Sequence, residues 1–169
     1  DYAAGRELEA LYLPVAGEKR HYPIAFNAIP QIDVFGEEGY TREEWKMVKE
    51  TQKIFGDPDF KVSPTTIRVP IMRSHCESIN VETVEPLSVE ECRVLLDNAP
   101  GLKVIDDVEN QEYPMPLFTS GQDPVYVGRI RRDFTVEHGL NLWVVGDQIR
   151  KGAALNAVQI AEHYTQKMG

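Results

Sequence analysis

The order of predicted elements along the 169-residue chain indicates an α+β domain: a mixed, mostly antiparallel sheet with helices on one face. Apolar residues alternate in several short runs that are joined by local hairpins rather than by repeated strand–helix–strand units. Two capping boxes mark helices between these runs. With 42% apolar residues the chain can bury a sizeable core, and one domain is the natural count.

The N-terminal part is predicted to be irregular. Residues 7–11 (ELEAL) are typical of the end of a helix, and a turn follows at residues 14–20. Residues 22–29 form an irregular or edge strand, interrupted by Pro23 and closed by Pro30. Residues 33–40 are predicted to be loop.

The clearest helix begins after Thr41. Thr41 and Glu44 have the spacing of a capping box, in which the hydroxyl and the carboxylate each satisfy a free backbone N–H. The helix is predicted to end at residues 56–58 (GDP). Glu43 and Lys46 share its polar side, where such pairs are most often solvated salt bridges worth a few tenths of a kcal/mol.

The stretch 68–82 (RVPIMRSHCESINVE) predicts a strand, a break and a second strand. Apolar residues alternate with polar ones at two places, first at Ile67, Val69 and Ile71 and then at Ile79 and Val81. In an unbroken strand Arg68 and His75 would point to opposite faces. Pro70 and the 72–74 step make a bulge or tight loop the better prediction, and such a loop could turn one side chain towards the other.

Arg68 and His75 would then form a site. A guanidinium can bind a carboxylate through two parallel hydrogen bonds, and an imidazole can transfer a proton near neutral pH. The ordinary alternative is a salt-bridged arginine and a surface or core histidine, and on composition alone that alternative is the commoner one.

The second half of the chain is more regular. A second capping box, Ser88 with Glu91, opens a helix that ends at residues 100–101. A short strand at 103–105 precedes a long loop, residues 106–124, of a length that is usually functional or wraps a neighbour. Residues 125–130 and 140–145 predict an antiparallel hairpin turning at 137–139. The last helix, 151–166, carries small residues that let a backbone or a flat ligand approach (Gly152, Ala153, Ala154, Ala157).

The net charge and the cysteine content argue against several classes of protein. The net charge of −9 argues against a nucleic-acid surface and an anionic-membrane surface. No apolar run approaches the roughly 18 residues of a membrane span. Cys76 and Cys92 have no partner pattern and fit a reduced, cytoplasmic protein. The chain starts with Asp inside helical-looking sequence, so we expect it to be cut from something longer.

Five stretches, in order from near residue 20 to residue 162, together resemble the aspartate-β-semialdehyde dehydrogenase family. They are HYPIAFNAIPQIDVF from His21, GYTREEWKMVKET from Gly39, IRVPIMRSHCESI from Ile67, VYVGRIRRD from Val125 and LNLWVVGDQIRKGAALNAVQIAE from Leu140. Five ordered motifs make this resemblance far more specific than any one of them.

The resemblance implies a role for five residues. Arg68 falls where the family binds the substrate α-carboxylate, and His75 falls on its catalytic acid–base histidine. Glu43 would bind the substrate amino group and Lys46 would help to bind phosphate. Asn156 falls where the family has an asparagine near the nicotinamide of NADP.

The family interconverts L-aspartyl-4-phosphate and L-aspartate-4-semialdehyde with NADP(H) through a cysteine thioester, in lysine, threonine and methionine biosynthesis. The resemblance implies a fold like the C-terminal domain of glyceraldehyde-3-phosphate dehydrogenase and a cytoplasmic homodimer or tetramer. Residues 1–147 would be the substrate-binding and dimerisation domain, and residues 148–169 a C-terminal helix that packs on a nucleotide-binding domain. That helix should then show an exposed apolar face.

The chemistry of the substrate agrees with these placements. An ammonium, a carboxylate and a phosphate call for one acidic and two basic groups, which Glu43, Arg68 and Lys46 supply. Thioester formation from a thiol calls for a base that later steers the intermediate, which suits a histidine.

Several departures limit what this chain is expected to do alone. It has no glycine-rich dinucleotide-binding turn, and neither Cys76 nor Cys92 lies in the Asn-Cys context of the family nucleophile. We therefore expect no turnover from the chain alone. VSPTTIRV stands where VSATCVRV is usual, and residues 147–149 read Asp-Gln-Ile rather than Asp-Asn-Leu.

Two other functions remain open. One is a non-catalytic dimerisation or interaction paralogue, although a pure scaffold has no need of Glu43, Lys46, Arg68 and His75 together. The other is a sibling acyl-phosphate reductase, whose substrate would lack the ammonium that Glu43 suits.

Overall fold

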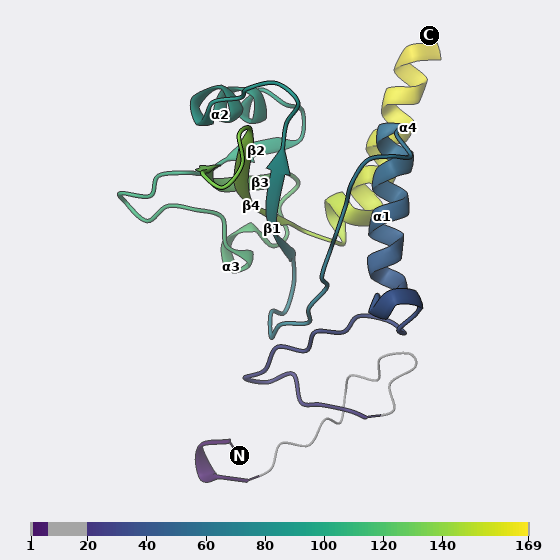
Figure 1. The fold of residues 1–169 in the computed structure, drawn as a ribbon, viewed down its shortest axis with the longest axis vertical. Coiled ribbons are helices and arrows are strands. Elements are labelled where there is room, and N and C mark those ends of the chain that lie inside the picture. The colour runs from purple at the N-terminus through teal and green to yellow at the C-terminus, as the bar shows by residue number, and fades with distance from the viewer. Residues whose placement is uncertain (1, 7–19, 169) are drawn as a thin grey trace. The chain divides into compact units, whose positions relative to one another are not determined.

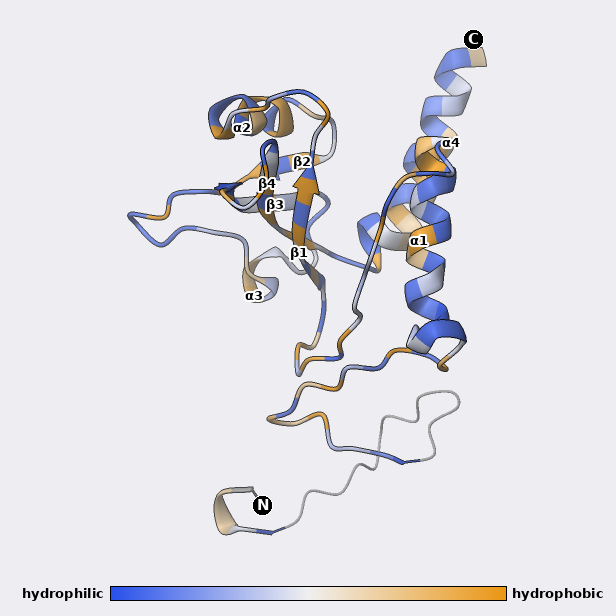
Figure 2. Ribbon diagram, in the orientation of Figure 1, coloured by the Kyte–Doolittle hydropathy of each residue, from blue (hydrophilic) through white to orange (hydrophobic). Residues whose placement is uncertain are grey.

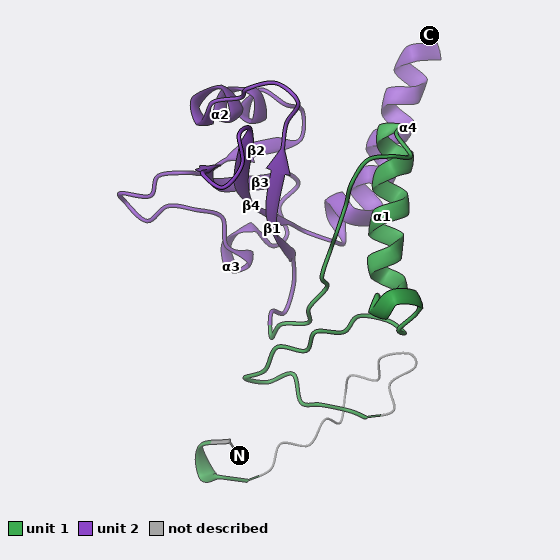
Figure 3. Ribbon diagram, in the orientation of Figure 1, with its two compact units in different colours: residues 1–70 green, residues 71–169 purple. Residues whose placement is uncertain are grey.

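A computed structural model describes residues 2–6 and 20–168, which divide into two compact units, residues 1–70 and 71–169 (Figure 3). The predicted helix end at residues 7–11 lies outside the described residues, as does nearly all of the turn predicted at 14–20. A short 3₁₀ turn, η1 (Tyr2–Ala4), is the only element described before residue 20.

Unit 1–70 contains one long helix, α1 (Arg42–Phe55), preceded by the 3₁₀ turn η2 (Glu37–Gly39). The predicted capping box is confirmed, because the Thr41 side chain accepts from the Glu44 N–H and the Glu44 side chain accepts from the Thr41 N–H. Gly56 ends the helix in the left-handed region, with φ at 67°, a conformation that glycine adopts without strain.

The strand predicted around residues 67–71 is wrong. Arg68 forms a single antiparallel bridge with Ile29, and the predicted edge strand at 22–29 is reduced to the same bridge. Ile67, Val69 and Ile71 are between 42% and 49% exposed. Pro64 and Pro70 flank the segment and donate no hydrogen bond, so the alternating pattern has no ladder to support it.

Unit 71–169 is built on a four-stranded mixed sheet (Figure 1). The strands lie in the order β1 (His75–Glu82), β4 (Gly139–Gly146), β3 (Val125–Asp133) and β2 (Leu102–Val104). Only β2 and β3 are parallel. The predicted fold class and the predicted hairpin are thereby confirmed, with the hairpin turn at residues 134–138.

One face of this sheet carries the core. Helix α2 (Val89–Asp97) begins at the predicted capping box and buries Cys92 against Val127, Ile130 and Leu140. Figure 2 shows apolar residues on α2 and on the strands beside it. Burying these side chains is the main stabilising term of the unit.

The other face is crossed by the segment after β2. Trp143 Nε1 donates to the Pro114 carbonyl at 2.9 Å, which fastens this segment to β4. Opposite Trp143, Gly128 lies so close that an added Cβ would be 2.2 Å from the Ile105 carbonyl oxygen. The long loop 106–124 is therefore packed on the sheet, and it includes the short helix α3 (Pro116–Thr119).

A buried carboxylate organises the turn after β4. Asp147 Oδ1 accepts the N–H groups of Ile149 and Arg150 at 2.9 and 3.1 Å, and Oδ2 accepts the Gly121 N–H at 2.6 Å. Arg73 Nε lies 2.7 Å from Oδ2, an ion pair rather than a directed hydrogen bond. Burial alone would raise the pKa of Asp147, but these groups outweigh it and lower the pKa from 3.8 to about 2.

The last helix follows this turn. It begins as a π-helical turn, η3 (Arg150–Ala154), and continues as α4 (Leu155–Met168), in agreement with the predicted range. Val158, Ile160 and Tyr164 are each more than half exposed, so α4 carries exposed apolar side chains, with Val158 and Ile160 on different sides of the helix. Among the described residues, no helix has the length and apolar content needed to cross a membrane.

Replacing Gly128 with alanine should lower the free energy of unfolding by about 2–3 kcal/mol, because the new methyl group overlaps a backbone carbonyl that cannot rotate away. Denaturant unfolding of the two chains measures this. Gly152→Ala is the matched control, since its Cβ would meet nothing closer than 3.7 Å. Equal stability of Gly128→Ala and the parent would contradict the close approach.

The lowered pKa of Asp147 predicts a loss of stability in acid. Its ionised form contributes fully above the unfolded pKa, near 4, and the contribution disappears as pH falls towards 2. Asp147→Asn should therefore be less stable at pH 6, with a smaller loss of stability between pH 5 and pH 3. Unfolding midpoints across this range test it. The exposed Asp123→Asn serves as control, and parallel pH curves for Asp147→Asn and the parent would refute the assignment.

Candidate functional site

An acidic and a basic side chain lie together on α1. Lys46 Nζ is 3.2 Å from Glu43 Oε1, and the two side chains remain 53% and 34% exposed. The hydrogen bond to Glu43 raises the pKa of Lys46, so the ammonium stays charged. The spacing of three residues places both groups on one side of the helix, as predicted, where a ligand can reach each of them.

Arg68 is fixed through its backbone. Its N–H donates to the Ile29 carbonyl at 2.8 Å, and its own carbonyl accepts from the Ile29 N–H at 2.9 Å. Its Nε is buried and has no hydrogen-bond partner within the described part of the chain. Because buried donors are nearly always satisfied, this unpartnered nitrogen is an exception among the described residues.

Glu44 ties these two features together. Its Oε2 accepts from the Thr41 N–H, while Oε1 accepts from the N–H and the hydroxyl of Thr66 at 2.8 and 3.3 Å. Burial would raise the pKa of Glu44, but the hydrogen bonds outweigh it and the net pKa is lowered. A single ionised carboxylate therefore connects the start of the Glu43–Lys46 helix to a residue two positions before Arg68.

His75 opens β1, opposite Gly146 at the end of β4, and its side chain is exposed. The preceding residue, Ser74, has φ at 84°, a left-handed conformation that is unusual for serine. The Ser74 N–H donates to Gln148 Oε1 at 2.7 Å, which holds this conformation. The tight loop predicted before His75 is thus confirmed.

A second set of contacts secures the same loop. Ser74 Oγ lies 2.8 Å from Ser120 Oγ, and Ser120 Oγ is also within hydrogen-bond distance of the carbonyls of Arg73 and Pro116. With the Arg73–Asp147 ion pair, these contacts join the residues before His75 to two separate turns. The position of His75 is therefore set from several directions, although the side chain itself is free to meet a ligand.

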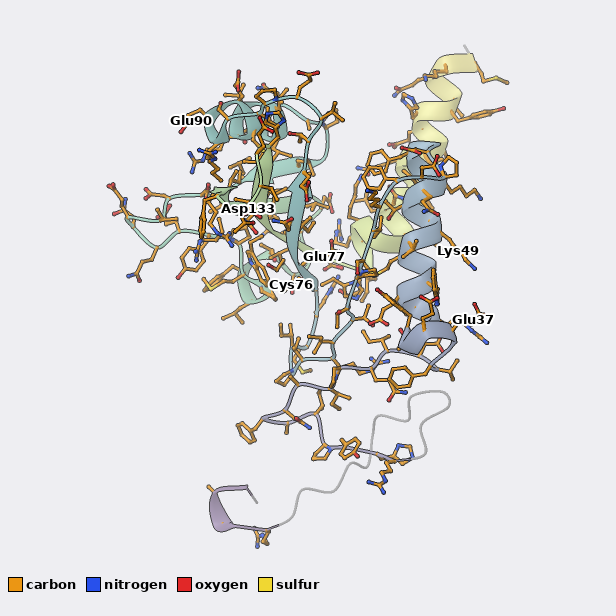
Figure 4. All side chains as sticks on the ribbon, in the orientation of Figure 1. Glu37, Lys49, Cys76, Glu77, Glu90 and Asp133 are labelled. Carbon is orange, nitrogen blue, oxygen red and sulfur yellow. The ribbon has the colours of Figure 1, made fainter. Side chains whose placement is uncertain are left out.

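Neither cysteine has the surroundings of an activated nucleophile. Cys76 follows His75 on β1 beside Glu77 (Figure 4). Burial and the Glu77 charge raise the pKa of its thiol. Burial also raises the pKa of Cys92, which lies in the core. Because reactive cysteines have lowered pKa values, both thiols fit structural roles.

Asn156 lies in the first turn of α4 and is half-buried. Its side-chain amide makes no hydrogen bond within residues 20–168. The small residues predicted to allow a close approach are all exposed: Gly152, Ala153, Ala154 and Ala157. Across the described ranges no three His, Cys, Asp or Glu side chains form a cluster suited to a metal ion.

The five site residues divide between the two units. Glu43, Lys46 and Arg68 belong to residues 1–70, whereas His75 and Asn156 belong to residues 71–169. The meeting of Arg68 with His75 stays a prediction. Sequence reasoning missed the second role of Glu44 and the supporting roles of the loop residues around Ser74. Two signals were available, namely the capping box and the unusual Asp-Gln pair at 147–148.

Comparison with known proteins agrees with the resemblance. Residues 4–151 match the family model described as semialdehyde dehydrogenase, dimerisation domain. The chain is 57% identical over 145 residues to the aspartate-semialdehyde dehydrogenase of Aquifex aeolicus, covering 86% of this chain and 43% of that protein. It is 50% identical over 157 residues to the enzyme of Bacillus subtilis, covering 92% and 45%.

A solved structure shares the fold. Aspartate semialdehyde dehydrogenase II from Vibrio cholerae, complexed with ASA, superposes with a TM-score of 0.82 at 45% identity, covering 90% of this chain and 45% of that one. The chain thus spans less than half the length of the relatives it matches. The match over residues 4–151 shows that this chain belongs to the semialdehyde dehydrogenase dimerisation-domain family.

Proposed function

We propose that the chain is the substrate-binding and dimerisation portion of an NADP-dependent aspartate-semialdehyde dehydrogenase. The observation that supports this best is the arrangement in unit 1–70, where Glu44 joins the Glu43–Lys46 pair to the Arg68 segment. One acidic and two basic groups match a substrate that carries an ammonium, a carboxylate and a phosphate.

Each group has a distinct part in substrate binding. The Arg68 guanidinium binds the α-carboxylate in a two-pronged contact, and its unpartnered Nε supports this role. Glu43 takes the ammonium and Lys46 takes the phosphate. Opening their mutual ion pair costs little, because exposed pairs of this kind contribute about 0.2–1 kcal/mol.

His75 acts as the acid–base group. In the proposed reaction a cysteine thiol adds to the aldehyde carbon, and the imidazole takes the thiol proton as the carbon–sulfur bond forms. The fixed Ser74 loop sets the backbone position of His75, from which the exposed ring reaches the thiol. Cys76 and Cys92 are unsuited to be the nucleophile, so we assign it to a residue outside this chain.

NADP, when bound, supplies the hydride chemistry. Asn156 has an unengaged amide and lies beside exposed small residues, which suits a flat nicotinamide ring held mainly by another part of the protein. Residues 148–169 would pack on that part. We further propose that the protein is a cytoplasmic homo-oligomer, at least a dimer, serving lysine, threonine and methionine biosynthesis.

A second candidate is a non-catalytic dimerisation paralogue. The raised thiol pKa values of both cysteines favour it, since this chain by itself offers no activated nucleophile. The two candidates differ in one respect that can be measured, which is turnover when the missing half is supplied.

The deciding experiment is phosphate-dependent reduction of NADP with aspartate semialdehyde. The chain is assayed alone and then with a separately made nucleotide-binding half of a relative. We expect no turnover alone, turnover in the mixture, and its loss with His75→Ala or Arg68→Ala. The exposed Arg42→Ala is the control. If sedimentation shows that the two halves have assembled and the mixture still reduces no NADP, the result favours the non-catalytic paralogue.

Glu44 should act as a positioning residue for this reaction. Glu44→Gln keeps the shape but places an N–H₂ group against a backbone donor, so we expect the Thr66 segment to shift and Arg68 to move with it. KM for the semialdehyde should rise by about tenfold while kcat changes less. The control is Lys53→Gln, at an exposed position of the same helix. A fall in kcat with unchanged KM would argue against the positioning role.

A further inference from the structure

Unit 71–169 carries an open cavity of about 590 Å³ that the proposed reaction does not use. Its lining combines three arginines with aliphatic, amide and aromatic side chains, among them Arg93, Arg129, Arg131, Val108, Gln111 and Tyr113. Every charged group in this lining is positive, although the whole chain has a net charge of −9. Small-molecule sites have volumes of roughly 300–1,000 Å³. The cavity therefore has the size and the charge of a site for an organic anion.

A β-bulge brings two of these arginines to the cavity. The register of β3 against β4 shifts between Gly128 and Arg131, because β3 has one residue more than its partner over this step. Ile130 is buried in the core, while Arg129 and Arg131 on either side of it are exposed. Arg129 has a left-handed backbone with φ at 52°, which an arginine seldom adopts. The irregular strand thus places two arginine side chains at one cavity.

The three arginines differ in the charge that they can offer to a ligand. Arg93 Nη2 lies 2.9 Å from the buried Oδ2 of Asp106, so its charge is already paired. The same oxygen accepts the Ile130 N–H at 3.2 Å, which ties Arg93 to the bulge. Arg131 donates to the Arg129 carbonyl at 2.8 Å. Within residues 20–168 neither Arg129 nor Arg131 forms an ion pair, so these two charges are available.

The acids near the cavity are engaged elsewhere or lie outside its lining. Asp133 Oδ1 accepts the N–H and the hydroxyl of Thr135 at 2.8 and 2.7 Å, and these bonds lower the pKa of Asp133 more than the charge of Arg131 does. The Asp107 carboxylate accepts the N–H and the side-chain amide of Asn110 at 3.0 and 2.7 Å. Two exposed acids of the loop do not line the cavity, namely Glu109 and Glu112.

A fixed turn forms the other wall of the cavity. Asp107 and Glu112 exchange two backbone hydrogen bonds at 2.9 and 2.7 Å, and Gln111 has φ at 60°. This turn carries Val108, which is 57% exposed, and Tyr113 follows directly after it. Groups that are ordered before a ligand arrives lose little conformational entropy when it binds.

The cavity lies towards the opposite end of β4 from His75. His75 is opposite Gly146, at the end of β4, whereas Arg131 is opposite Asn141, near its beginning. The step from Asn141 to Gly146 spans roughly 17 Å of extended strand. A ligand in the cavity would therefore act apart from the acid–base group of the proposed reaction.

We propose that this cavity binds an organic phosphate with at least two negative charges and a flat or apolar body. Arg129 and Arg131 bind the phosphate oxygens, because a guanidinium presents several N–H donors in one plane. The body of the ligand packs against Tyr113 and Val108, which an inorganic phosphate could not do. The dehydrogenase reaction uses none of these residues, so the site is independent of that function.

Calorimetric titration of the whole chain with ADP at low ionic strength tests the site. The double variant Arg129→Gln/Arg131→Gln should weaken ADP binding at least about 30-fold, since two charge-assisted contacts are lost. Tyr113→Leu should weaken it about fivefold through the lost ring contact. Inorganic pyrophosphate, which has the charges without the body, should bind more weakly than ADP and should not respond to Tyr113→Leu. Arg132→Gln, at an exposed position of β3 outside the lining, is the matched control and should leave ADP binding unchanged.

Three results would overturn the site. The first is an absence of ADP binding, and the second is pyrophosphate binding as tight as that of ADP. The third is ADP binding that Lys46→Gln abolishes and Arg129→Gln/Arg131→Gln spares, which would place the ligand in unit 1–70. If an arginine variant unfolds, NMR of the parent chain decides. ADP should shift the amide signals of residues 108–113 and 129–131, and shifts confined to other residues would refute the proposal.

Discussion

The structure of unit 71–169 depends on one buried carboxylate that accepts several backbone N–H groups. Asp147 draws together the end of β4, the turn after α3 and, through Arg73, the entry to β1. These segments are far apart in the sequence. The ladder between β1 and β4 ends at the His75–Gly146 pair and does not reach the turn after α3. A carboxylate has enough acceptor sites to hold all of them at once, which no neutral side chain could do.

In unit 1–70 the carboxylate of Glu44 likewise joins separate segments by accepting backbone N–H groups. One of its oxygens completes a helix cap and the other holds the Thr66 segment, so a local motif also makes a long-range connection. In each unit a predicted site residue lies close in sequence to such a carboxylate or its partner: Glu43 precedes Glu44, and His75 lies two residues after the Arg73 that pairs with Asp147. The backbone near these residues is fixed by a carboxylate whose pKa is lowered by the contacts it makes.

The predictable part of the molecule was the part that local rules govern. The capping boxes at Thr41 and Ser88, the hairpin and the last helix follow from residues within a few positions of one another. The predicted strand at 67–71 was wrong because an alternation of apolar and polar residues does not show whether a partner strand exists. The hydrogen bond from Ser74 to Gln148 spans 74 positions and leaves no periodic trace, so the unusual Gln148 could be noticed in the sequence but its partner could not be named.

The position of β1 has a consequence for how the chain meets other molecules. In the sheet that the described residues form, this strand lies at the edge, so one row of its backbone groups can pair with a foreign strand. Glu77 and Glu82 place exposed negative charges along that edge, and a second copy offering the same strand would be repelled. The acids thereby discourage open-ended stacking of sheets into fibres, while contacts made elsewhere on the surface can still close into finite assemblies.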